Sequence, residues 1–153
     1  MMKAFCKTVP AQKGKLRMAK VYITQVPHKH DRETDTFVPA VNISPATEHG
    51  ELIVMMPPRT SFYATVDLVK MLSEKLKDYN YDNGDSIVSM GDPSVIAVAF
   101  ALLGRIHGRF IVLKWDKNVG RYLSAHVSVL EFQTASEKLT NEMIAEGQER
   151  KKK

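Results

Sequence analysis

Two aspartates stand where a carboxylate could take part in chemistry. Asp92 follows a short apolar segment at 86–90, and Asp116 follows a second one at 109–115. If these segments are parallel strands, both side chains lie at the carboxyl edge of a sheet, where open α/β sheets bind ligands. Two carboxylates at that edge could hold Mg²⁺ together with substrate phosphates. A small ligand- or metal-binding enzyme is therefore one interpretation of this chain.

Each aspartate also has a sufficient structural role. Asp92 precedes Pro93, a combination typical of a helix N-cap followed by the first helical residue. Asp116 opens the sequence DKNVG, which is typical of a tight turn. We therefore expect a helix cap and a turn residue at these positions. We predict no catalytic residue, no bound metal and no cofactor.

Other candidate groups give weaker signals. Gly91 precedes a predicted helix, but the chain has neither GxxxxGK[ST] nor GxGxxG, the motifs that cradle phosphate. His28, His30 and Asp31 form an H-x-H-D cluster, to which His49 could add a third imidazole for a metal ion. This cluster lies in a polar stretch after a proline, so we expect solvated histidines there.

Positive charge is concentrated at the two ends of the chain. The net charge is +5, yet residues 21–148 contain 12 basic and 16 acidic residues. Residues 1–20 carry six basic residues and no acid, and the last five residues read ERKKK. Basic ends can contact phosphate without sequence specificity. The candidate nucleic-acid-binding residues are Lys13, Lys15, Arg17, Lys20, Arg150, Lys151, Lys152 and Lys153.

Hydrophobic patterning predicts an α+β fold with element order β-β-β-α-β-α-β-β-α, in which helices pack on a mixed sheet. The expected strands are 20–26, 36–43 (an edge or broken strand, because it contains Pro39), 51–56, 86–90, 109–115 and 121–132. The expected helices cover 61–79, 93–106 and a polar segment from Thr134. The helix at 93–106 shows no polar face, so we expect it to be buried on most sides.

These elements suggest a single domain with an extension at each end. We expect a basic, flexible N-terminal extension over 1–19, one globular domain over 20–132, and a polar C-terminal helix with a basic tail over 133–153. Residues 1–17 are interpreted as an upstream extension of a domain that begins near Met18. No apolar run reaches the ~18 residues that a membrane span needs, so no membrane partner is expected.

One part of the sequence resembles a known family. The run GDPSVI, followed by a helix rich in small residues and then by LKWDKNVGRY, resembles a family of small, uncharacterised tailed-phage proteins. The resemblance rests on Gly91, Asp92, Pro93, Leu113, Lys114, Trp115, Asp116 and Tyr122, and it covers about residues 20–130. It implies a viral source and a compact domain, and it supplies no activity.

The sequence thus favours a phage-encoded, non-catalytic accessory protein of the host cytoplasm. We expect it to bind a protein partner or a nucleic acid, with the basic tails contacting phosphate. The alternatives are the small enzyme at Asp92 and Asp116 and a structural component of the virion. An oligomer is compatible with each interpretation.

Overall fold

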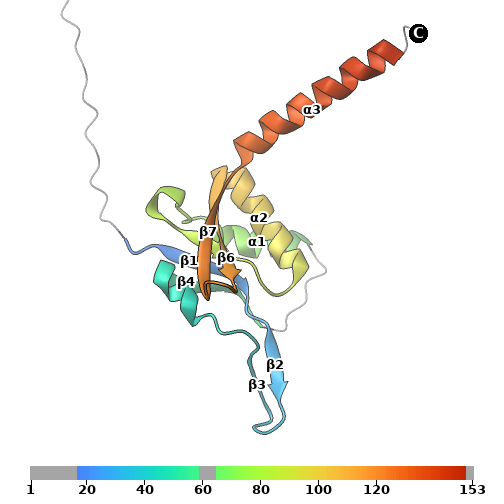
Figure 1. Cartoon of the computed structure of the whole chain (residues 1–153). Coiled ribbons are helices and arrows are strands. Elements are labelled where there is room, and N and C mark those ends of the chain that lie inside the picture. Colours follow the sequence, from blue (N-terminus) through green and yellow to red (C-terminus); the bar gives the residue numbers. More distant parts are fainter. Residues whose placement is uncertain (1–16, 59–64, 151–153) are drawn as a thin grey trace, which may run out of the picture.

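A five-stranded mixed sheet forms the centre of the computed structural model, which describes residues 17–58 and 65–150 (Figure 1). Its strand order is β4-β1-β5-β6-β7. Four strands are parallel: β4 (Glu51–Met56), β1 (Lys20–Gln25), β5 (Ser86–Val88) and β6 (Arg109–Asp116). The last strand, β7 (Arg121–Ser128), forms an antiparallel hairpin with β6, as the alternating sequence predicted. The predicted α+β class is confirmed.

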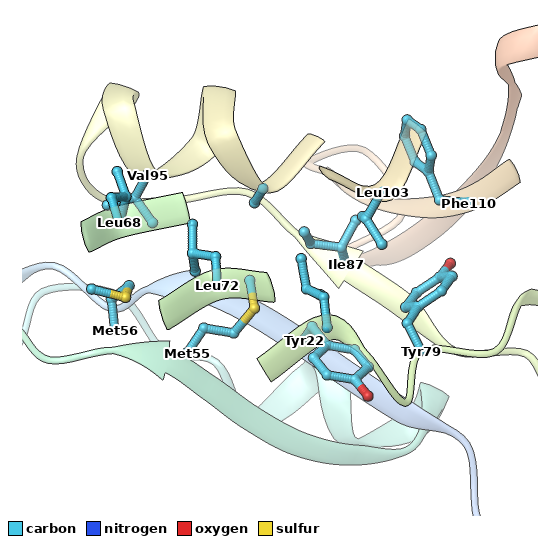
Figure 2. Packing of buried hydrophobic residues seen from close by; sticks show 12 residues of the cluster. Tyr22, Met55, Met56, Leu68, Leu72, Tyr79, Ile87, Val95, Leu103 and Phe110 are labelled. Carbon is cyan, nitrogen blue, oxygen red and sulfur yellow. The ribbon is translucent and has the colours of Figure 1, made fainter. Parts of the chain in front are cut away.

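Two helices cover one face of this sheet. Helix α1 (Thr65–Leu76) and helix α2 (Pro93–His107) pack against each other and against the strands. Figure 2 shows their side chains above the sheet residues Tyr22 and Ile87. The fully buried members from the two helices are Leu68, Leu72, Leu76, Val95, Ala99 and Leu103.

The opposite face carries a smaller core. A short 3-10 helix, η1 (Ser44–His49), places Ala46 against it. The other buried members of this cluster are Val21, Ile23, Val26, Val88, Leu113 and Tyr122. After β1 the chain adds β4 on one side of β1, at the edge of the sheet. After β4 it adds β5 and then β6 on the other side of β1. Right-handed connections then require the segment after β1 and the helices α1 and α2 to lie on opposite faces, as observed.

Two elements project from this body (Figure 1). A separate hairpin is formed by β2 (His28–Asp31) and β3 (Thr36–Pro39). Helix α3 (Val129–Arg150) follows β7 with no residue between them. Within the described ranges, no helix is long and apolar enough to cross a membrane.

The structure corrects the predicted boundaries at several points. The polar segment after Pro27 forms β2 rather than a loop, so four strands precede the first α-helix. The strand predicted over 36–43 ends at Pro39, lies outside the main sheet, and pairs only with β2. The strand predicted over 121–132 ends at Ser128, and the helix expected from Thr134 begins at Val129. Part of the helix predicted over 61–79 lies outside the described residues, which resume at Thr65.

Helix α2 is not buried on most sides, contrary to the expectation from its apolar sequence. Its buried residues are Val95, Ala99 and Leu103, which are spaced four apart and share one face. Ile106 is 50% exposed, and Phe100 is only partly buried. The sheet and α1 contact one side of α2, and away from that side the first residue of α3, Val129, approaches Gly104.

Candidate functional site

Asp92 caps helix α2. Its carboxylate Oδ1 accepts a hydrogen bond of 2.7 Å from the Ser94 N–H, as an N-cap does. The Asp92 N–H in turn donates to Oε1 of Gln25, at 2.9 Å. At Gly91, which has φ of 89°, a Cβ would lie 2.6 Å from the carbonyl oxygen of Gln25. The segment around Gly91 thus packs directly against Gln25 at the carboxyl end of β1.

Asp116 organises the turn between β6 and β7. Its Oδ1 accepts hydrogen bonds from the N–H groups of Asn118 (2.8 Å) and Val119 (3.1 Å). Because β5 and β6 are parallel, Asp92 and Asp116 do follow carboxyl ends of neighbouring strands. Each carboxylate accepts hydrogen bonds from its own local backbone, which accounts for both residues structurally.

The histidines of the H-x-H-D motif do not converge. His28 bonds through Nδ1 to the Val26 carbonyl (2.9 Å), and His30 bonds through Nε2 to Oδ1 of Asp35 (2.8 Å). His49 lies elsewhere, with Nε2 at 3.2 Å from the backbone oxygen of Tyr122. Among the residues that the structure describes, no three His, Cys, Asp or Glu side chains gather as a metal site would require.

Arg17, a candidate phosphate-binding residue, is bound to the domain instead. Its guanidinium forms an ion pair with Asp85, with Nη1 at 3.1 Å from Oδ1, and Nη2 donates to the Asp78 carbonyl at 2.9 Å. The backbone N–H of Lys20, another candidate, also donates to Asp85, at 2.9 Å. Arg150 is the last residue of α3. The remaining candidates, Lys13, Lys15, Lys151, Lys152 and Lys153, lie outside the described residues.

Asp85 is a fully buried carboxylate that joins the start of β1 to the segment before β5. Burial opposes its ionisation, but hydrogen bonds from Arg17, the Lys20 and Asn80 N–H groups and Asn83 outweigh that effect and lower its pKa below the usual value. Its own backbone carbonyl accepts the Tyr79 hydroxyl at 2.7 Å. The arrangement stabilises the fold and leaves the carboxylate inaccessible to a substrate.

An apolar pocket of about 530 Å³ lies on the face of the sheet opposite α1 and α2. It lies beside the carboxyl ends of β5 and β6, between these strands and the segment that leads into η1. Apart from Asn42, Ser89 and Lys114, its lining is apolar: Val41, Pro45, Val88, Met90, Val112, Leu113, Trp115 and Tyr122. We call this feature the open-face pocket.

Trp115 and Tyr122 form an aromatic pair in the open-face pocket. Their rings meet edge to face with centroids 5.1 Å apart. Trp115 is 46% exposed, whereas Tyr122 is buried, and burial raises the pKa of its phenol. Within the described residues the Tyr122 hydroxyl makes no hydrogen bond. The Trp115 ring thus offers a bound group an apolar surface, and the Tyr122 hydroxyl beside it offers a hydrogen-bonding group.

The sequence could not have revealed this pocket. Val41 lies in a segment whose sequence predicts an edge or broken strand, and more than 70 residues separate it from Trp115. The pocket forms only because the fold brings the segment that contains Val41 next to the strand that contains Trp115. The available signal was the aromatic pair itself, because Trp115 and Tyr122 are cross-strand neighbours in a hairpin that the sequence did predict.

A second hollow adjoins the pocket and shares Lys114 and Trp115 with it. The second hollow is also lined by Asp116, Lys117, Leu123, Ser124 and Ala125. Trp115 therefore lies between an apolar cavity and a more polar depression that contains two lysines.

Fold and site together define a two-layer α+β protein whose less covered sheet face holds an apolar pocket. The family described as "Phage Pam3 gp32-like protein" matches residues 19–129, and the chain belongs to this family. The match supports the resemblance to small phage proteins. No curated protein and no solved structure matches the chain significantly.

Proposed function

We propose that this chain is a phage accessory protein without catalytic activity of its own, which acts by binding a protein partner in the open-face pocket. The occupant is a segment of the partner that inserts one aromatic or large aliphatic side chain. We assign this binding to the cytoplasm of the infected host, where the single cysteine would remain reduced.

The open-face pocket is the observation that carries this proposal. Concave apolar cavities with a few polar groups are typical of sites that bind a small molecule, and one large side chain of a protein partner presents the same kind of surface. Aromatic residues that are partly exposed beside such a cavity are typical of the energetic centres of protein interfaces. Trp115 has both properties, since it lines the cavity and is 46% exposed.

The charge around the pocket indicates what should flank the inserted side chain. Lys114 borders both hollows and Lys117 borders the second, and both lysines are exposed. Asp116, between them in the sequence, already accepts two backbone hydrogen bonds. We therefore expect the partner segment to carry acidic residues beside its apolar side chain, because opposite charges favour the encounter.

The basic ends of the chain support nucleic acid as a second candidate partner. Phosphate contacts by lysines need no folded groove, and four of the five residues at 149–153 are basic. This candidate concerns the ends of the chain, whereas the protein partner occupies the domain, so separate variants can test the two.

The test of the protein-binding proposal uses the intrinsic fluorescence of Trp115, the only tryptophan of the chain. The probes are synthetic peptides that tile the proteins of the encoding phage. We expect a peptide with an aromatic or large aliphatic residue next to acidic ones to shift the Trp115 emission to shorter wavelength. The Val41→Asp variant should weaken binding at least about tenfold, since it places a charge in an apolar pocket.

Val66→Asp is the matched control. Val66 is 81% exposed on α1, on the other face of the sheet, so this variant adds the same charge away from the pocket and should bind as the parent does. Binding that survives Val41→Asp would contradict the proposal, as would the absence of any binding peptide.

A further inference from the structure

We propose that helix α3 pairs with α3 of a second copy of this chain, in antiparallel orientation, and so forms a dimer. This inference is independent of what occupies the open-face pocket. It rests on the exposure of α3, on the spacing of its apolar residues, and on the distribution of charge along the chain.

Helix α3 lacks packing along nearly all of its length. From Leu130 to Ala145, each residue whose exposure the structure describes is exposed. Leu139 is 60% exposed and Met143 is 66% exposed. A helix of 22 residues is about 33 Å long, and isolated helices are only marginally stable in water, because most helical stability comes from tertiary packing. Such a helix would be stabilised by a partner along its side.

One stripe along α3 carries Leu139 and Met143, whereas the exposed Leu130 and Ile144 lie off it. Leu139 and Met143 are four residues apart, and Val129, Ser136 and Met143 follow one another at intervals of seven. In the sequence, Phe132 also stands seven residues before Leu139. A stripe with alternating steps of three and four residues is the seam through which two helices pair in a coiled coil. One helix can therefore meet a copy of itself along this stripe.

The start of α3 is fixed against the domain. The Val129 N–H donates to the Gly108 carbonyl at 2.8 Å, and Val129 is packed against the main core. A Cβ built at Gly104 would lie 3.0 Å from a methyl group of Val129, so the helix starts close against α2. The orientation of α3 relative to its own domain is therefore the same in both copies. This favours a single arrangement of the pair.

Charge favours the antiparallel orientation. In a parallel pair the two ERKKK ends would lie side by side, and their like charges would repel each other. In an antiparallel pair each basic end lies beside the start of the partner's α3 and its domain. The first half of α3 carries Glu131 and Glu137, both exposed, so the contact brings the basic end of one copy beside two carboxylates of the other.

The oligomeric state of the full chain tests the proposal. Light scattering coupled to size-exclusion chromatography should give the mass of a dimer at about 100 µM, a concentration far above the Kd of a micromolar complex. Leu139→Glu should give the mass of a monomer, because it introduces a charge into the seam. A parent chain that is monomeric at this concentration would overturn the inference, and α3 would then serve a different partner.

Leu130→Glu is the matched control. Leu130 is 67% exposed, and it lies nine residues, or about two and a half turns, before Leu139, so it is on the opposite side of α3. This variant should remain dimeric. Equal loss of the dimer in both variants would show that the stripe is not the interface. Circular dichroism and thermal unfolding of each variant confirm that the domain is folded.

Orientation is tested with Met143→Cys in a Cys6→Ser background. In a parallel pair the two introduced thiols would face each other and form a disulfide readily. In the antiparallel pair, Arg150 of one copy lies beside Val129 of the other, so we expect the two introduced thiols to be offset by about seven residues along the helix, about 10 Å, which is too far for a bridge. Efficient cross-linking of this variant would contradict the antiparallel arrangement.

Discussion

The structure gives Arg17 a different role from the one that its place in the sequence suggests. In the sequence it is one of six basic residues in an acid-free segment, and it suggested phosphate binding. In the structure it neutralises Asp85, which lies 68 positions further along the chain and is fully buried. No local pattern could have paired these two residues. The folded unit therefore includes a residue on the amino side of Met18.

We predict that the domain depends on Arg17 but not on residues 1–15. Deleting 1–15 should leave the free energy of unfolding nearly unchanged. Deleting 1–17 should lower it by about 1.5–3 kcal/mol, the typical contribution of a hydrogen bond to a charged group. Urea unfolding at pH 7 measures both deletions, and Arg17→Ala in the full chain serves as the control. Equal stability of all these chains would show that the ion pair contributes nothing.

The ionisation of Asp85 should make stability depend on pH in the acid range. Its pKa is lower in the folded state than in the unfolded chain, so the stabilisation is fully present above the unfolded pKa of about 3.9. It is lost as the pH falls through the lower, folded pKa. Urea unfolding between about pH 5 and pH 2 should show the parent losing stability in that window.

Asp85→Asn isolates this contribution, because it keeps the shape of the side chain and removes the charge. We expect the variant to be less stable than the parent at pH 7 and to show a flatter dependence below pH 4. A pH profile parallel to that of the parent would mean that other carboxylates cause the acid sensitivity.

At the scale of elements, the sequence predicted what local patterns determine. Alternation and β-branched residues located β1 and the β6–β7 hairpin, a continuous apolar run located β4, and Asp92 with Pro93 located the first turn of α2. It did not predict which side of α2 is buried, because its apolar residues surround the axis and only tertiary contacts choose between them. It also missed β2, whose polar sequence HKHD forms a strand through pairing with β3.

The burial of α2 on one face predicts unequal effects of truncating its side chains. Leu103 is fully buried between the sheet and α1, so Leu103→Ala should cost about 2–5 kcal/mol through the cavity that it leaves. Ile106 is 50% exposed, and Ile106→Ala should cost much less. Chemical denaturation of both variants measures the difference. Similar losses would mean that α2 is covered on its outer side as well, in solution, by another molecule.

At the scale of the whole molecule, the contrast between a mildly acidic domain and basic ends is the feature that the sequence disclosed best. Simple counting of charges revealed it, since net charge does not depend on the fold. The structure shows in addition that the Arg17 guanidinium forms an ion pair with Asp85 and is therefore not available to phosphate. Among the candidate residues, the attraction to nucleic acid should therefore come from those in residues 1–16 and 150–153, with the Lys20 side chain as the remaining candidate on the domain.

We predict weak binding of the full chain to a double-stranded DNA oligonucleotide, which decreases steeply as salt is raised, because lysine–phosphate contacts release counterions. Deleting residues 1–16 and 150–153 together should abolish this binding and leave the fold intact. Fluorescence anisotropy at several salt concentrations measures it. Salt-resistant binding by the truncated chain would instead indicate a groove on the domain.

The direct junction between β7 and α3 has a mechanical consequence. Ser128 is the last residue of the strand and Val129 the first of the helix, so no flexible loop separates them. A rotation of α3 at this junction therefore displaces the far end of the helix much more than its start. A rotation of about 10° at the junction would move the far end of the 33 Å helix by about 6 Å. Small changes in the twist of the β6–β7 hairpin, which also carries Trp115 and Tyr122, would thus be magnified at the tip of α3.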